Sequence, residues 1–330
     1  MEKKNNFFDV WIFIVAIFTA SVGIGWLWYK GLNLPLSAIS MVTGMLGFFF
    51  WIFIYRRPMS EMYYKGYPYR KLKVWGALVA FLFFEFIISW GLHTGQIGFA
   101  DQNLYSVIVV FAGSLVFYFA FIRMRISLRY LFLGIFIPLL ASGSIIGMGK
   151  YFGFVNFYLP QENVTKAVIF NTCYWIIFNM LYHLICEEPA FRGFLLQRLM
   201  DKGKARAVII SSLVFAAWRL SIGVFQNVTV QQYAVSFLES FTIGCLLAVL
   251  FIKGKNLLIA AITHGIIDGL RISLFAGDKY PGLDQYFTVA PAAQFAELKL
   301  IALWIGCLFL GIMLVLMIPQ KRSLKPCRTC

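Results

Sequence analysis

Long apolar blocks alternate with short polar connections along the whole chain. A helix needs about 20 mostly apolar residues to cross the hydrocarbon core of a bilayer, whereas a helix on a soluble core carries polar residues along its outer face. These blocks are long enough to cross the bilayer. They also lack the regularly spaced polar positions of a helix on a soluble core. The pattern therefore predicts an all-α, polytopic transmembrane helical bundle of about ten spans, at residues 8–29, 33–55, 74–92, 104–122, 129–149, 166–186, 207–225, 232–252, 256–275 and 297–318.

Lysine and arginine are concentrated in alternate connections. The connection 56–73 is rich in both, the next one at 93–103 contains neither, and the stretch 187–206 is basic again. Cytoplasmic loops of membrane proteins carry an excess of Lys and Arg. This rule places the basic connections and both termini in the cytoplasm, which agrees with an even number of spans.

The overall composition supports membrane embedding. Of the 330 residues, 61% are hydrophobic and 13% are charged, against about 25% charged residues in a typical soluble domain. The net charge of +15 would suit nucleic-acid binding, but the basic residues lie in short connections where membrane topology places them. We therefore expect an integral membrane protein that has the lipid bilayer as a partner and does not bind nucleic acid.

Polar residues within the apolar blocks divide the chain into three parts. Residues 1–165 form five compositionally uniform spans, and residues 166–275 form a core that carries the intramembrane polar residues. Residues 276–330 form an extracytoplasmic loop, the last span and a basic cytoplasmic tail. No inverted repeat is visible, which disfavours a transporter that relays charge through buried ionisable residues.

The first candidate motif is a pair of glutamates at the end of the sixth predicted span. Ionisable residues at this depth are costly and indicate function. On a helix, adjacent side chains project about 100° apart, so Glu187 and Glu188 face different surroundings. Arg192 lies four residues after Glu188, the spacing of an ion pair, which leaves Glu187 for proton transfer. Pro189 is expected to bend the helix. The alternative is an acidic turn at the membrane interface.

Two further motifs lie in the seventh and ninth predicted spans. His264 and Asp268 share one face of a helix, where an imidazole could stabilise a developing oxyanion; the alternative is a hydrogen-bonded pair that joins two helices. Arg219, if buried, must face a carboxylate or water, and we expect a carboxylate within about 4 Å of it. The alternative is a lone arginine that reaches back to the interface.

Taken together and in this order, these motifs resemble the CAAX protease and bacteriocin-processing family of intramembrane endopeptidases, also called the Abi family. Its signature is EExxxR, then FxxxH, then HxxxN or HxxxD, and the resemblance covers about residues 166–275. It implies that Glu187 activates a water molecule and that Glu188 with Arg192 forms a supporting ion pair. It also implies that His264 and Asp268 polarise the peptide carbonyl, and it indicates a bacterial plasma membrane protein.

The second motif departs from the family pattern, because Arg219 stands where the family has histidine, four residues after Phe215. Arginine is always charged and only donates hydrogen bonds, so near Glu187 it would tie that carboxylate and weaken it as a base. His183, four residues before Glu187, is a candidate auxiliary imidazole; the alternative is a packed helix histidine. With His264 as the one motif histidine, we expect no metal and no cofactor.

Two functions follow from these residues. The first is a glutamate-dependent endopeptidase that cleaves a peptide or membrane-protein substrate, lipidated or not, near the cytoplasmic face. The second is a catalytically silent family member that acts by binding, in bacteriocin immunity or as a regulatory partner. Under the first, Arg219→His raises cleavage and Glu187→Ala abolishes it. Under the second, Glu187→Ala changes nothing.

Overall fold

The computed structural model of the chain describes residues 7–31, 37–57, 126–153, 155–157, 162–223, 230–275, 287–289 and 296–319. Its α-helices are α1 (Phe8–Tyr29), α2 (Ser37–Phe49), α6 (Leu128–Tyr151), α7 (Glu162–Ile185), α8 (Gln197–Leu199), α9 (Lys204–Gly223), α10 (Val230–Gly254), α11 (Leu257–Phe275) and α12 (Ala296–Met317). π-Helices follow α2 at Phe50–Ile54 and the acid pair at Pro189–Leu196, and Met200–Lys202 is a 3₁₀ turn.

The helical class predicted from the apolar blocks is confirmed over these residues. The predicted spans 74–92 and 104–122 lie outside them, and the other eight each coincide with a helix. A two-stranded antiparallel sheet departs from the all-α prediction: β1 (Val155–Phe157) pairs with β2 (Phe287–Val289), with Asn156 opposite Thr288. Strands of three residues are too short to produce a recognisable alternation in the sequence.

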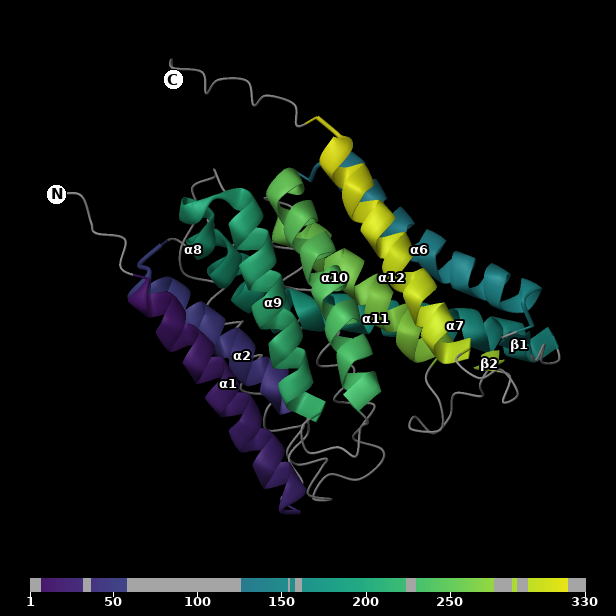
Figure 1. Cartoon of the computed structure of the whole chain (residues 1–330), viewed down its shortest axis with the longest axis horizontal. Coiled ribbons are helices and arrows are strands. Elements are labelled where there is room, and N and C mark those ends of the chain that lie inside the picture. The colour runs from purple at the N-terminus through teal and green to yellow at the C-terminus, as the bar shows by residue number, and fades with distance from the viewer. Residues whose placement is uncertain are drawn as a thin grey trace.

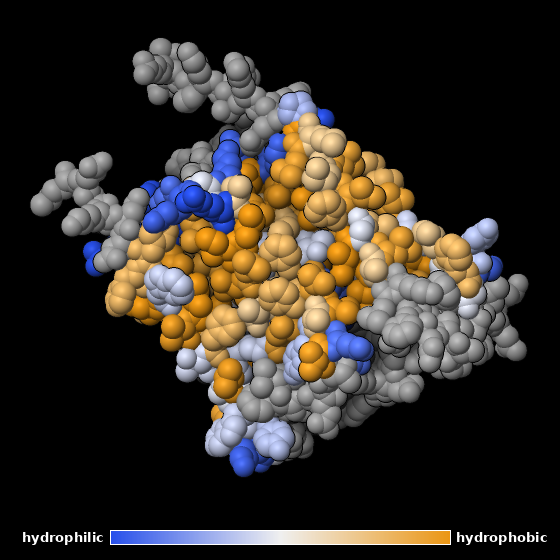
Figure 2. All heavy atoms as spheres, viewed as in Figure 1, coloured by the Kyte–Doolittle hydropathy of each residue, from blue (hydrophilic) through white to orange (hydrophobic). Residues whose placement is uncertain are grey.

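Four of the described helices are long and apolar enough to cross a membrane by themselves: Phe8–Leu27, Leu128–Tyr151, Val230–Gly254 and Leu300–Met317. Large apolar side chains on them face outward, among them Trp11, Phe132 and Leu310. Figure 2 shows hydrophobic residues over most of the coloured surface, with hydrophilic residues gathered over α8 and the start of α9. An apolar outer surface of this extent is stable against lipid chains and unfavourable in water. With the four spanning helices, it indicates an integral membrane protein.

The helices form a bundle in which two outer pairs flank a central pair. In Figure 1, α1 and α2 lie on one side, α6 and α12 on the other, and α9 and α10 stand between them. Helices α7 and α11 cross behind this pair and pack extensively against each other. Because α7 leads to the glutamate pair and α11 carries His264, this crossing brings the first and third motifs together.

Glycines allow the closest of these crossings. A Cβ at Gly269 would lie 2.6 Å from the Cα of Ile176, and one at Gly265 would overlap the backbone of Met180. Helix α11 therefore touches the backbone of α7 directly, as small residues permit where membrane helices cross. Gly265, which follows His264, thus allows the close approach of the two helices that brings the imidazole of His264 to the acid pair.

Helix α2 meets the acid pair in the same way from the opposite side. A Cβ at Gly44 would lie 2.6 Å from the carbonyl oxygen of Cys186, and one at Gly47 would lie 2.6 Å from the Cα of Ala190. These two glycines place the backbone of α2 against the residues that flank Glu187. The N-terminal part of the chain therefore forms one wall of the candidate site.

Candidate active site

The glutamate pair lies at a change of helix type. Helix α7 ends at Ile185, and the π-helix begins at Pro189, so the regular α-helix is interrupted next to this proline. Both carboxylates are buried, with Glu187 3% and Glu188 0% exposed. π-Helical turns are frequent at functional sites, and this one begins directly after the acid pair.

Glu188 is held by two donors. Its Oε1 lies 3.1 Å from Nη1 of Arg192 and 2.7 Å from Nδ1 of His264. Arg192 is itself 2% exposed, and its guanidinium lies 4.4 Å from the ring centre of Phe215. The ion pair predicted from the four-residue spacing is therefore present, and it also fixes the imidazole of His264.

Glu187 has different neighbours. Its Oε1 accepts a hydrogen bond from the Ser40 hydroxyl at 3.1 Å. Its Oε2 faces His183 Nδ1 at 3.6 Å and His264 Nε2 at 3.9 Å. Ser40 comes from α2, and we did not identify it from the sequence. The small residues at 40, 44 and 47, which share one face of that helix, were the available signal.

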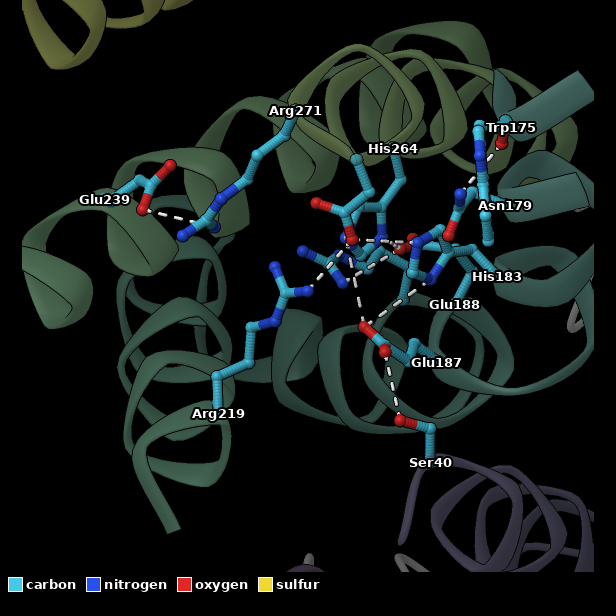
Figure 3. Close-up of polar contacts among 12 residues, drawn as sticks. Ser40, Trp175, Asn179, His183, Glu187, Glu188, Arg219, Glu239, His264 and Arg271 are labelled. Atoms are coloured by element: carbon cyan, nitrogen blue, oxygen red, sulfur yellow. Dashed lines mark hydrogen bonds and ion pairs between the residues drawn. The ribbon is translucent and has the colours of Figure 1, made fainter. Parts of the chain in front are cut away.

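The two imidazoles lie face to face in the centre of the site (Figure 3). The rings of His183 and His264 are parallel within 5°, with centroids 3.6 Å apart. Nε2 of His183 lies 3.0 Å from Oδ2 of Asp268, and Nε2 of His264 lies 3.5 Å from the same oxygen. His183, the candidate auxiliary residue, is thus part of the cluster.

Arg219 has a carboxylate partner, but it is Asp268: Nη2 of Arg219 lies 2.9 Å from Oδ2 of Asp268. The concern that Arg219 would tie Glu187 is not borne out by this pairing, because α11 places Asp268 between α9 and the glutamates. Figure 3 shows the arginine reaching toward the cluster from α9. Its Nη1 is buried and makes no hydrogen bond with any described residue, so a donor remains on the site.

A third ion pair of this region lies farther along α10 and α11. Nη1 of Arg271 is 3.4 Å from Oε2 of Glu239, and the Arg271 side chain is 55% exposed. Figure 3 places this pair beside the cluster but separate from the imidazoles. It joins an arginine to a glutamate, as the buried Glu188–Arg192 pair does, but its arginine is exposed to solvent or lipid headgroups. It therefore serves as a control for that pair.

Three of the clustered residues could hold a cation. Among the described residues, His183, Glu187 and His264 each offer one ligand atom, and these atoms lie within 4.8 Å of one another. The expectation of no metal from the sequence was based on His264 as the one motif histidine. It treated His183 only as a candidate auxiliary imidazole. The structure brings both imidazoles to the same carboxylate, that of Glu187.

The arrangement defines a class: a helical membrane protein with buried carboxylates and imidazoles gathered at a helix crossing. The model of the family described as type II CAAX prenyl endopeptidase Rce1-like matches residues 169–270. This match confirms the resemblance predicted from the motifs over that segment, which contains the glutamate pair, Arg219 and the HxxxD motif. No curated protein matches the chain. Ser40 and α2 lie outside the matched segment.

Proposed function

We propose that the protein is an intramembrane endopeptidase in which Glu187 activates a water molecule for attack on a peptide bond. The proposal rests on the surroundings of the Glu187 carboxylate, which is buried and has no guanidinium as a salt-bridge partner within the described ranges. Glu188 is paired with Arg192 and Asp268 with Arg219, whereas Oε2 of Glu187 is buried and has no hydrogen-bond partner among the residues that the structure describes. A carboxylate that is buried and not neutralised by a guanidinium is suited to accept a proton.

The surrounding residues fit supporting roles. Glu188 and Arg192 orient His264 through its Nδ1. His264 Nε2 faces Glu187, so a proton taken from water can pass to the imidazole and then to the departing amine. The unpartnered Nη1 of Arg219 supplies a permanent donor to the oxyanion that develops at the carbonyl. In this scheme Arg219 stabilises the transition state and does not weaken Glu187 as a base.

The proposal also covers the class of substrate, the membrane in which the protein lies and its topology. The family to which residues 169–270 match is described by its action as a CAAX prenyl endopeptidase, which supports a peptide or membrane-protein substrate that carries a lipid. We place the protein in a bacterial plasma membrane with ten spans and both termini in the cytoplasm. Residues 166–275 would then be the catalytic core, with cleavage near the cytoplasmic face.

The test is cleavage of a quenched fluorescent peptide that ends in a prenylated CAAX sequence, with the full chain reconstituted in liposomes. Glu187→Gln keeps the size of the side chain and removes the base, and we expect it to lower the rate by about 100-fold or more. Glu239→Gln is the matched control, because that glutamate belongs to the outer ion pair, and it should cleave at the wild-type rate. Equal cleavage by wild type and Glu187→Gln would refute Glu187 as the base, whereas no cleavage by the wild type would refute the enzyme and favour the binding role.

Arg219 gives a second measurement. Arg219→His leaves Asp268 without its guanidinium and removes the donor at Nη1. We therefore expect slower cleavage, which revises the increase expected from the sequence alone. A faster variant would show that the arginine hinders Glu187 and would contradict the role assigned to it here.

A further inference from the structure

The hydroxyl of Ser40 differs from other hydroxyls of the bundle in the acceptor to which it donates. Serine and threonine inside helices often donate to a carbonyl four residues earlier on the same helix. Several hydroxyls of this chain do so, those of Ser21, Thr43, Thr242 and Thr263. Ser40 is 5% exposed and donates instead across the helices, to Oε1 of Glu187 at 3.1 Å. This hydroxyl therefore links α2 to the acid pair.

Backbone contacts fix the position of this hydroxyl. Ser40, Gly44 and Gly47 follow one another at spacings of four and three residues, which places them on one face of α2. A Cβ at either glycine would lie 2.6 Å from a backbone atom of the chain around Glu187. Because backbone touches backbone beside the bond, α2 holds the hydroxyl at a set distance from the carboxylate.

The bond gives the two oxygens of Glu187 different surroundings (Figure 3). Oε1 accepts the hydrogen bond from Ser40, whereas Oε2 faces His183 Nδ1 at 3.6 Å and His264 Nε2 at 3.9 Å. The last torsion of a glutamate side chain has broad energy wells, so a carboxylate without a donor can turn about this bond. Ser40 restrains that rotation and keeps Oε2 toward the imidazoles.

The charged groups nearby do not restrain the carboxylate in this way. The guanidiniums of Arg192 and Arg219 are bonded to other acids. The two imidazoles lie 3.6 and 3.9 Å from Oε2, which is beyond the usual range of a hydrogen bond. Within the described part of the chain, the Ser40 hydroxyl is the one hydrogen-bond donor to the Glu187 side chain.

We propose that Ser40 is a positioning residue for Glu187, so that α2 belongs to the catalytic unit. The inference rests on the proposed function and deepens it. Oε2 takes a proton from water as the water oxygen attacks the carbonyl carbon, and the proton passes to Nε2 of His264. The hydroxyl of Ser40 keeps Oε2 in the orientation that both steps need. A residue outside the matched segment 169–270 thus contributes to the rate.

The test compares kcat and KM for cleavage of the prenylated peptide by the full chain in liposomes. Ser40→Ala removes the hydroxyl and leaves Glu187 in place. We expect kcat to fall by about 10- to 100-fold and KM to change little, because a misaligned base affects the chemical step and not the binding of substrate. Thr43→Val is the matched control, since this buried hydroxyl of the same helix donates to its own backbone at Ile39. It should keep the wild-type kcat.

A double variant separates positioning from packing. If Ser40 acts through Glu187, removal of its hydroxyl has no further effect once the base is gone. Ser40→Ala/Glu187→Gln should therefore cleave at the same residual rate as Glu187→Gln, measured over long incubations. A packing role for Ser40 predicts instead that the hydroxyl matters by the same factor in both backgrounds, and that result overturns the inference.

Failure of the inference and failure of the proposed function give different results. Wild-type cleavage with an unchanged kcat in Ser40→Ala, or with an equal loss in Thr43→Val, overturns the role of Ser40 and leaves the peptidase in place. Absence of cleavage by the wild type overturns the peptidase and the positioning role together.

Discussion

Removal of the guanidinium from the buried ion pair should cost a large part of the stability of the fold. In Arg192→Met, Glu188 keeps its charge in a site where both side chains are at most 2% exposed, and only His264 remains beside it. Breaking a buried pair from one side costs about 3–5 kcal/mol. Because His264 can take up a proton and compensate in part, we expect about 3 kcal/mol, which corresponds to roughly a 100-fold change in the folding equilibrium.

The free energy of unfolding would be measured by denaturant titration of the purified chain in mixed micelles. Arg271→Met is the matched control, because it breaks an arginine–glutamate pair whose arginine is 55% exposed, and it should cost about 0–1 kcal/mol. The double variant Arg192→Met/Glu188→Leu should recover most of the loss, since no unpaired charge remains. Equal losses in Arg192→Met and Arg271→Met would refute the assignment of the buried pair.

Two other predictions concern packing and topology. Gly265→Val should destabilise the protein by more than 2 kcal/mol, because its side chain would overlap the backbone of α7, whereas Gly143→Val, with open space around it, should stay within about 1 kcal/mol of wild type in the same titration. For topology, a membrane-impermeant thiol reagent should label the cysteines at 327 and 330 only after spheroplasts are opened, and labelling of intact cells would contradict a cytoplasmic C-terminus.

The sequence predicted the helices well because each apolar block has one low-energy structure in lipid. Backbone groups in the bilayer core must be satisfied within the segment, so α1, α6 and α12 follow from composition alone. The strands β1 and β2 could not be predicted in this way. Their pairing joins residues far apart in the chain, and three residues give too little pattern to detect.

Within the candidate site, local spacing predicted some contacts and not others. The pair between Glu188 and Arg192 follows from the geometry of one helical turn. The partner of Arg219 does not, because Asp268 lies on another helix and the choice depends on how α9 and α11 pack. The stacking of His183 on His264 depends in the same way on the glycine contact between α7 and α11.

The contact between α2 and the acid pair has a consequence for the timing of synthesis. Ser40 precedes Glu187 by 147 residues, so at 5–20 residues per second the ribosome reaches the glutamate on the order of ten seconds after the serine. His264 and Asp268 follow later still. A nascent chain therefore lacks a complete cluster until most of its helices have been synthesised.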